Sequence, residues 1–156
     1  MKDTRKSISL FSGAMGLDLG LEQAGINIQL GQDFDVSCVK TMQKNGRQAL
    51  LGDIRKIEPE DLLSASGMTF GEPFLICGGP PCQPFSTAGK RLGINDPRGS
   101  LFREYVRMID SIRPRFFVME NVKGLMSSPL KDADGKSTEG KVIDIILEEF
   151  SKLHYK

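Results

Sequence analysis

Short apolar runs alternate with longer amphipathic segments along the whole chain, and this alternation limits the folds open to it. Short apolar runs predict strands at residues 7–11, 26–32, 49–51, 74–77 and 116–119. Helical periodicity and turn residues predict helices at 17–24, 36–44, 59–65, 101–112 and 141–153. Parallel strands need helical crossovers, so we expect an α/β fold with one parallel sheet and helices on both faces.

The remaining segments predict two loops. Residues 78–99 are rich in glycine and proline, and an ordered loop of that length is usually functional. Residues 127–140 are polar and predict a second loop.

Composition excludes several classes of protein. No apolar run approaches the ~18 to 20 residues that span a bilayer, and no export signal follows the basic start of the chain. The three cysteines lack paired spacing and His154 is the only histidine, so we expect a reduced, metal-free cytoplasmic protein, nucleoid-associated if bacterial. A net charge of +1 restricts any nucleic-acid surface to a local patch. His154 ends a predicted helix, where it would interact with the helix dipole.

Five residues suited to binding or catalysis follow the ends of successive predicted strands. In parallel α/β sheets, ligands bind beyond the carboxyl ends of the strands. We therefore expect one crevice to be lined by Gly13, Asp33, Asp53, Cys82 and Glu120.

The first turn of this crevice favours a nucleoside ligand. Gly13 lies where a strand turns sharply into a helix, and Asp33 follows twenty residues later, where a carboxylate commonly binds ribose hydroxyls. The usual phosphate-binding glycine patterns are absent, so a nucleoside without phosphates fits better. Phe34 would stack on an adenine or belong to the core. Asp53 would accept from the adenine amino group or cap the next segment.

Cys82 and Glu120 are the candidates for chemistry. Cys82 lies between prolines on the loop at 78–99, which indicates a presented nucleophile, whereas Cys38 and Cys77 lie in apolar runs typical of structural cysteines. Glu120 ends an apolar strand, a setting that favours its protonated form; a cap or an ion pair is the alternative. Asn121 beside it supplies a second polar group for reading a planar ring.

Longer motifs resemble one enzyme family. Gly-Pro-Pro-Cys-Gln-Pro-Phe-Ser at 79–86, Met-Glu-Asn-Val at 119–122 and Leu-Phe-Ser-Gly at 10–13 occur in the order and spacing of the cytosine-5 DNA methyltransferases. Asp-Ile at 53–54 and Arg-Gly-Ser-Leu-Phe at 98–102 also match. The resemblance implies a Rossmann-like, S-adenosylmethionine-dependent methyltransferase fold, with residues 1–156 forming the cofactor-binding and catalytic domain.

The resemblance also implies the reaction: a methyl group passes from S-adenosylmethionine to C5 of a cytosine flipped out of double-stranded DNA, in a restriction-modification or genome-methylation system. Cys82 would add to ring atom C6, and Glu120 would protonate N3. The cofactor would be bound by Phe11, Gly13, Asp33, Phe34, Asp53, Ile54 and Leu101. Loop and substrate contacts would come from Pro81, Gln83, Ser86, Lys90, Arg91, Arg98 and Asn121.

Basic residues are concentrated between residues 88 and 115, where seven lysines and arginines against three acidic residues leave a surplus of +4. The surplus predicts a local patch for DNA phosphates, and the alternative is an ordinary solvated helix face. The patch would comprise Lys90, Arg91, Arg98, Arg103, Arg107, Arg113 and Arg115.

The chain departs from the family pattern in two respects. Met15 stands where the family usually has a glycine. The family's Gln-x-Arg-x-Arg segment, target-recognition region and closing motifs are absent, so we expect a sheet incomplete at its C-terminal end, with an open edge. A second chain supplying those motifs would cover that edge. This portion would be inactive alone, whether it is a natural fragment, a split subunit or an artificial truncation.

Other functions stay open at this point. An inactive S-adenosylmethionine-binding fragment and a tRNA cytosine-5 methyltransferase are alternatives, because the region that would separate DNA from RNA and define the target sequence is absent. A nicotinamide-binding or thiol-redox domain is disfavoured, since it gives no reason for the motifs around Cys82 and Glu120 to occur together.

Overall fold

The structure is a computed structural model that describes residues 5–81, 100–127, 129–131 and 137–155. The chain divides into two compact units. The first unit contains Met1–Pro80 and Arg107–Glu120, and the second contains Pro81–Val106 and Asn121–Lys156. Helix α4 (Ser100–Ile112) therefore contributes to both units.

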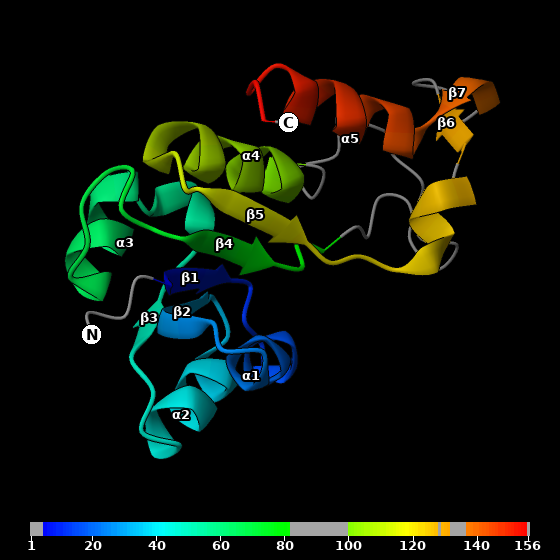
Figure 1. Ribbon diagram of the computed structural model, residues 1–156. Helices are drawn as coiled ribbons and strands as arrows, with labels where there is room; N and C mark the ends of the chain where they lie inside the picture. The colour runs from blue at the N-terminus through cyan, green and yellow to red at the C-terminus, as the bar shows by residue number, and fades with distance from the viewer. Residues whose placement is uncertain (1–4, 82–99, 128, 132–136, 156) are drawn as a thin grey trace. The chain divides into compact units, whose positions relative to one another are not determined.

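A five-stranded parallel sheet with the order β3-β2-β1-β4-β5 forms the centre of the first unit (Figure 1). This arrangement confirms the α/β architecture expected from the sequence. Apart from α4, the elements of the unit are β1 (Lys6–Leu10), α1 (Gly16–Gln23), β2 (Asn27–Asp33), α2 (Val36–Lys44), β3 (Ala49–Leu51), the 3₁₀ turn η1 (Ile54–Lys56), α3 (Pro59–Ser66), β4 (Leu75–Gly78) and β5 (Phe116–Met119).

Local capping residues explain several of these bounds. The Asp35 side chain accepts a 2.6 Å hydrogen bond from the Ser37 amide at the start of α2. Helix α3 begins at Pro59, whose missing N–H is not needed there, and ends at Gly67 in the left-handed conformation. Among the helices that the structure describes, none is long and apolar enough to cross a membrane.

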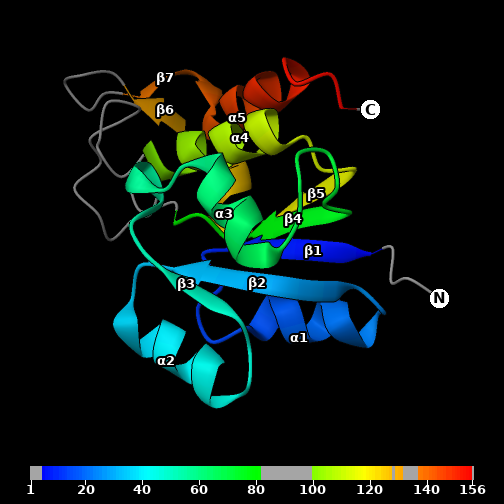
Figure 2. The ribbon, with the colours of Figure 1, turned by 90° about the vertical axis from the view of Figure 1, so that its left-hand side faces the viewer.

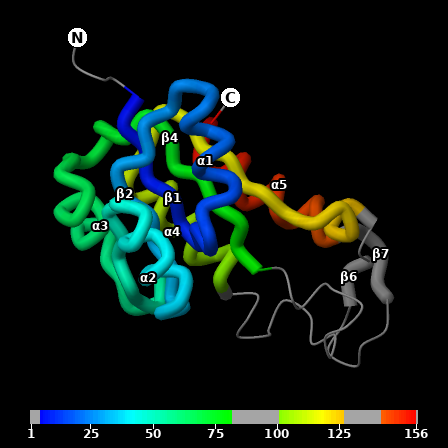
Figure 3. Tube along the Cα trace, turned by 90° about the horizontal axis from the view of Figure 1, so that it is seen from below, coloured from blue at the N-terminus to red at the C-terminus, as the bar shows by residue number. Residues whose placement is uncertain are grey.

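Helices cover both faces of the sheet. Helices α1 and α2 lie on one face, and Figure 3 shows them in front of β1 and β2. Helix α3 and the C-terminal half of α4 lie on the other face (Figure 2). On the α1 side, Leu17 and Leu21 pack against a buried cluster of Ile28, Leu75 and Cys77. This core fixes α1 against strands β2 and β4.

The second unit contains a hairpin that the sequence did not predict. Strands β6 (Pro129–Lys131) and β7 (Ser137–Lys141) pair antiparallel within the region expected to be a polar loop, so that expectation is wrong for these residues. The strands have no apolar alternation, so periodicity carries no signal for them. The unit also contains η4 (Lys123–Ser127) and α5 (Val142–Ser151). The Phe150 ring on α5 lies edge-on to Phe102 at 5.6 Å and to Tyr105 at 6.4 Å between ring centroids.

Strand β5 is the outer strand of the five-stranded sheet among the described residues. Its side chains Phe116 and Val118 are 49% and 41% exposed. The sequence predicted an open edge at the C-terminal end of the sheet, and among the described residues β5 forms such an edge.

Candidate active site

Parallel register brings the predicted strand-end residues to one edge of the first unit's sheet. Leu10 is opposite Gln32 on one side and Gly78 on the other, Asp33 is opposite Leu51, and Gly78 is opposite Met119. The residues that follow these positions therefore leave the sheet at its carboxyl edge. Gly13, Asp53 and Glu120 follow strand ends at this edge and Asp33 is the last residue of β2, as predicted, while Cys82 lies outside the described residues.

A hydrogen bond accounts for the spacing of Gly13 and Asp33. The Gly13 amide donates to Asp33 Oδ2 at 2.8 Å, and the Asp35 amide donates to Asp33 Oδ1 at 2.9 Å. The Asp33 residue is only 7% exposed. Each carboxylate oxygen keeps a second acceptor site, so Asp33 can shape the turn and still accept from a ligand hydroxyl.

The turn between β1 and α1 has unusual backbone geometry. Phe11, Gly13 and Met15 have φ angles of 54°, 53° and 67°. A left-handed backbone is rare for bulky side chains such as Phe and Met. Among the described residues, apart from its two chain neighbours, no atom lies within 4 Å of a Cβ built on Gly13. Its conformation and this open space fit a backbone that a ligand approaches closely.

A buried polar cluster lies beneath this turn, and sequence reasoning missed it. Ser9 Oγ donates to Asp18 Oδ1 at 2.6 Å, and Ser12 Oγ lies 2.9 Å from Ser9 Oγ. Asp18 is 1% exposed, and burial raises the pKa of its carboxyl group, although the Ser9 hydrogen bond opposes that shift. An acidic residue in the first turn of an amphipathic helix is typical of an exposed side chain that interacts favourably with the helix dipole. The sequence therefore gave no sign that Asp18 is buried.

The aromatic ring of Phe34 is available to a ligand. Phe34 follows β2 directly and is 69% exposed. The interpretation of Phe34 as a core residue is therefore wrong, and stacking on an adenine remains a prediction that its exposure permits.

Asp53 caps the turn η1, which was one of its two predicted roles. Its Oδ1 atom accepts from the Arg55 amide at 3.1 Å. The Arg55 guanidinium also donates to both carboxylate oxygens, at 2.9 Å from Nε to Oδ1 and 2.6 Å from Nη2 to Oδ2. The hydrogen bond from Arg55 lowers the pKa of Asp53, so the group is a carboxylate at neutral pH and can accept from an amino group. Ile54, beside it, is buried at 2% exposure.

Glu120 lies against the backbone of Gly79. Its amide donates to the Gly78 carbonyl at 2.9 Å, and a Cβ built on Gly79 would lie only 2.8 Å from Glu120 Oε2. The carboxylate position thus depends on residue 79 having no side chain. The predicted apolar surrounding is not provided by the described residues, because Glu120 follows the outer strand and is exposed. The Asn121 Oδ1 atom accepts from the Val122 amide at 2.9 Å.

Neither described cysteine suits a nucleophilic role. Cys77 is 0% exposed, and burial raises the pKa of its thiol to about 12. Burial and the carboxylates of Asp33 and Asp35 raise the pKa of Cys38. A thiol must ionise to attack, so neither residue competes with the role predicted for Cys82.

The remaining predicted residues divide into two groups. Pro81 and Leu101 are half-buried and belong to the second unit. The others lie outside the described residues: Gln83, Ser86, Lys90, Arg91 and Arg98.

Three of the four arginines of the predicted basic patch that the structure describes have local partners. Arg107 donates to two backbone carbonyls, Arg113 pairs with Asp110, and the Arg115 guanidinium lies 5.6 Å from the centroid of the Phe116 ring. Local partners thus engage these three residues, and the binding of DNA phosphates by the patch stays a prediction. No group of three or more His, Cys, Asp or Glu side chains in the described part of the chain could hold a metal ion.

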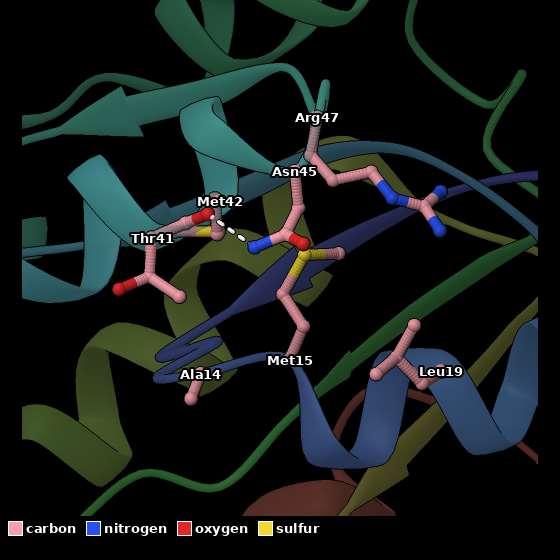
Figure 4. Close-up of a pocket in the computed structure, with 7 residues that line it drawn as sticks. All are labelled: Ala14, Met15, Leu19, Thr41, Met42, Asn45 and Arg47. Atoms are coloured by element: carbon pink, nitrogen blue, oxygen red, sulfur yellow. Dashed lines mark hydrogen bonds between the residues drawn. The ribbon is translucent and has the colours of Figure 1, made fainter.

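A pocket of about 180 Å³ lies between α1 and α2 (Figure 4). Ligand sites usually measure ~300 to 1,000 Å³, so this pocket is small for a nucleoside cofactor. None of the predicted site residues lines it. The lining residues are Ala14, Met15, Leu19, Thr41, Met42, Asn45 and Arg47.

Comparisons with known proteins agree on one family. The sequence model of the family described as C-5 cytosine-specific DNA methylase matches residues 5–156. Type II methyltransferase M.FnuDI of Fusobacterium nucleatum is 44% identical over 151 residues, which cover 96% of this chain and 39% of the relative. M.AquIA of Picosynechococcus sp. is 40% identical over 150 residues, which cover 95% of this chain and 57% of the relative. The chain therefore spans less than two thirds of the length of these curated relatives.

The fold of the chain is also similar to that of a solved methyltransferase structure. The crystal structure of S. pombe Dnmt2 methyltransferase matches with a TM-score of 0.62 at 23% identity, covering 95% of this chain and 40% of that one.

Proposed function

The chain belongs to the C-5 cytosine-specific DNA methylase family, and from this membership we propose that the intact protein is a DNA (cytosine-5-)-methyltransferase. Residues 1–156 would form its cofactor-binding and catalytic domain. The structural observation that carries the proposal is the gathering of Gly13, Asp33, Asp53 and Glu120 at one sheet edge, in the order in which the family's motifs follow the strands.

The residues at this edge fit the nucleoside part of S-adenosylmethionine. The open side of Gly13 admits close approach, and the exposed Phe34 ring offers a stacking surface. Asp33 and Asp53 would accept hydrogen bonds from ribose hydroxyls and from the adenine amino group, which their positions at this edge and the lowered pKa of Asp53 support. When bound, the cofactor supplies an electrophilic methyl group on a sulfonium sulfur.

Two residues of the chain would drive the substrate chemistry. The Cys82 thiolate forms a bond to cytosine C6, and the electron pair of the C5=C6 bond becomes available at C5 while Glu120 donates a proton to N3. C5 would then take the methyl group as its bond to the sulfonium sulfur breaks, which leaves a neutral thioether. A water molecule would accept the proton from C5, and the electron pair of that C–H bond would restore the ring double bond as the bond from Cys82 to C6 breaks and returns the thiolate. Glu120 recovers its proton from N3. The Gly79 backbone beside the carboxylate would keep Glu120 in place for both transfers.

Double-stranded DNA is the proposed substrate, and the cytoplasm is where a restriction-modification or genome-methylation enzyme would meet it. The open edge at β5, with Phe116 and Val118 exposed, fits cover by the family's closing motifs, supplied by the same chain or by a second one.

The proposal is tested by methyl transfer from tritiated S-adenosylmethionine to DNA by the intact protein, with tRNA as the competing substrate. Label incorporated into DNA supports the proposal, and label found only in tRNA contradicts it. Cys82→Ser should abolish covalent trapping on DNA containing 5-fluorocytosine and leave cofactor binding intact. Cys38→Ser is the matched control and should trap like the wild type; trapping by Cys82→Ser would remove Cys82 from the mechanism.

A further inference from the structure

Arg107 on α4 reaches across to the turn that follows Asp53. One nitrogen of its guanidinium, Nη2, donates to the Ile54 carbonyl at 3.0 Å and to the Ile57 carbonyl at 2.9 Å. Its other terminal nitrogen lies 3.5 Å from Glu58 Oε2. These contacts join α4 to a backbone segment about fifty residues earlier in the chain. Arg107 was predicted to contact DNA phosphates, yet its described contacts are with this turn.

The turn is also anchored at its beginning, from strand β2. Gln32 Nε2 donates to the Gly52 carbonyl at 2.7 Å, and the Gly52 amide donates to the Asp33 carbonyl at 3.0 Å. A Cβ on Gly52 would lie 3.0 Å from Ile57 Cδ1, so the turn is tightly packed. The β2 contacts thus hold the residue before Asp53, and Arg107 holds the residues after it.

The Asp53 carboxylate is oriented by the segment that Arg107 holds. Its hydrogen bonds come from the amide and the guanidinium of Arg55, which lies in η1 between the two carbonyls that accept from Arg107. A shift of η1 would therefore move both donors that fix the carboxylate. An arginine suits this task because its planar fork can bind two acceptors and a carboxylate together, which a lysine ammonium cannot reproduce.

We propose that Arg107 is a positioning residue that fixes the Asp53 carboxylate opposite the 6-amino group of the cofactor's adenine, and so sets the preference for adenine over a 6-oxo purine. The inference rests on the proposed function, because it takes Asp53 as the acceptor for that amino group. A 6-oxo group presents an acceptor where the amino group presents donors, so a correctly placed carboxylate repels it. A displaced carboxylate loses this discrimination while stacking on Phe34 and contacts with the ribose persist.

The test is calorimetric titration of the intact protein with S-adenosylhomocysteine and with its inosine counterpart, S-inosylhomocysteine. For Arg107→Ala, we expect the ratio of the two dissociation constants to fall by about tenfold, mainly through weaker adenine binding. For Arg107→Lys, the ratio of the two dissociation constants should lie between those of the wild type and of Arg107→Ala. Arg103→Ala removes an exposed arginine of the same helix and should leave the ratio unchanged.

A double-mutant cycle separates positioning from a general loss of structure. Asp53→Asn should bring the ratio of the two dissociation constants close to one. Adding Arg107→Ala to the Asp53→Asn protein should then change this ratio little. If Arg107→Ala does not fold, the ratio of the two dissociation constants is measured with Arg107→Lys in its place, and it should fall below the wild-type ratio.

Equal weakening of both ligands by Arg107→Ala, or an unchanged ratio, would overturn the positioning role alone. A wild-type protein that binds neither ligand would overturn the proposed function, and this inference with it.

Discussion

The backbone amide of Gly13 donates a 2.8 Å hydrogen bond to Asp33 Oδ2, and this bond ties the turn after β1 to the end of β2. A carboxylate predicted to bind a cofactor is thus also part of the scaffold that shapes the cofactor turn. Loss of its side chain should affect stability and binding together.

Asp33→Ala should lower the free energy of unfolding by about 2 to 3 kcal/mol, because two amides lose a charged acceptor. Cofactor affinity should fall as well. Urea unfolding and calorimetric titration measure the two effects. Asp35→Ala is the control: it removes a helix cap worth about 1 kcal/mol without touching Gly13, and it should leave cofactor affinity near the wild-type value. Equal affinity losses in both variants would contradict the scaffold role.

Gly79→Ala should slow methyl transfer by about ten- to a hundredfold, because the new methyl group would lie 2.8 Å from Glu120 Oε2 and must displace the carboxylate. Cofactor affinity should change little. Single-turnover kinetics with labelled cofactor measure the rate, and Glu120→Gln should show a loss of the same kind.

Gly20→Ala controls for the substitution itself, since a Cβ on Gly20 meets no atom of the described residues within 4 Å beyond its chain neighbours and the adjacent backbone of its own helix. Wild-type rates in Gly79→Ala or in Glu120→Gln would remove the Glu120 carboxylate from the rate-limiting step.

Asp18→Asn should gain stability relative to the wild type as pH rises. Burial raises the pKa of Asp18 above its usual value, so the folded state binds the proton more tightly than the unfolded state does. Asp18 therefore contributes stability that is fully present below the unfolded pKa and is lost as pH rises through the folded pKa. Asparagine cannot titrate and keeps an acceptor for Ser9.

Urea unfolding of both proteins across the acidic to neutral range checks the slope. The groups that act on Asp18 are Ser9, Ser12, Glu22, Arg47 and Cys77. Parallel stability curves for wild type and Asp18→Asn would exclude a titrating Asp18.

Met15→Gly should destabilise the protein even though it restores the residue usual in the family. The left-handed backbone at φ 67° costs methionine about 1 to 2 kcal/mol, which glycine would recover. The Met15 side chain is 5% exposed and packs with Val39 and Met42, and deleting such a side chain costs about 2 to 5 kcal/mol. The difference between these two ranges is a net loss of about 0 to 4 kcal/mol, with a central value of about 2 kcal/mol, measured by thermal or urea unfolding. A more stable Met15→Gly variant would show that backbone strain outweighs burial.

Much of the fold was predictable because its signals are local. The predicted bounds of α2, β3 and β5 agree with the structure. Asp35 at the start of α2 and Pro59 at the start of α3 are local signals, so the neighbouring sequence was sufficient to predict where these helices begin. The hairpin β6–β7 was missed because polar strands without alternation carry no periodic signal.

For the candidate site, residue identity and order along the chain were enough to place Gly13, Asp33, Asp53 and Glu120 at one sheet edge, since parallel strands share the direction of their carboxyl ends. The surroundings of each side chain could not be predicted from residue identity and order. The burial of Asp18, the exposure of Phe34 and Glu120, and the inward contacts of Arg107 all depend on which segments pack against each residue. Those segments are distant in sequence, so packing alone determines whether a charge is solvated, paired or buried.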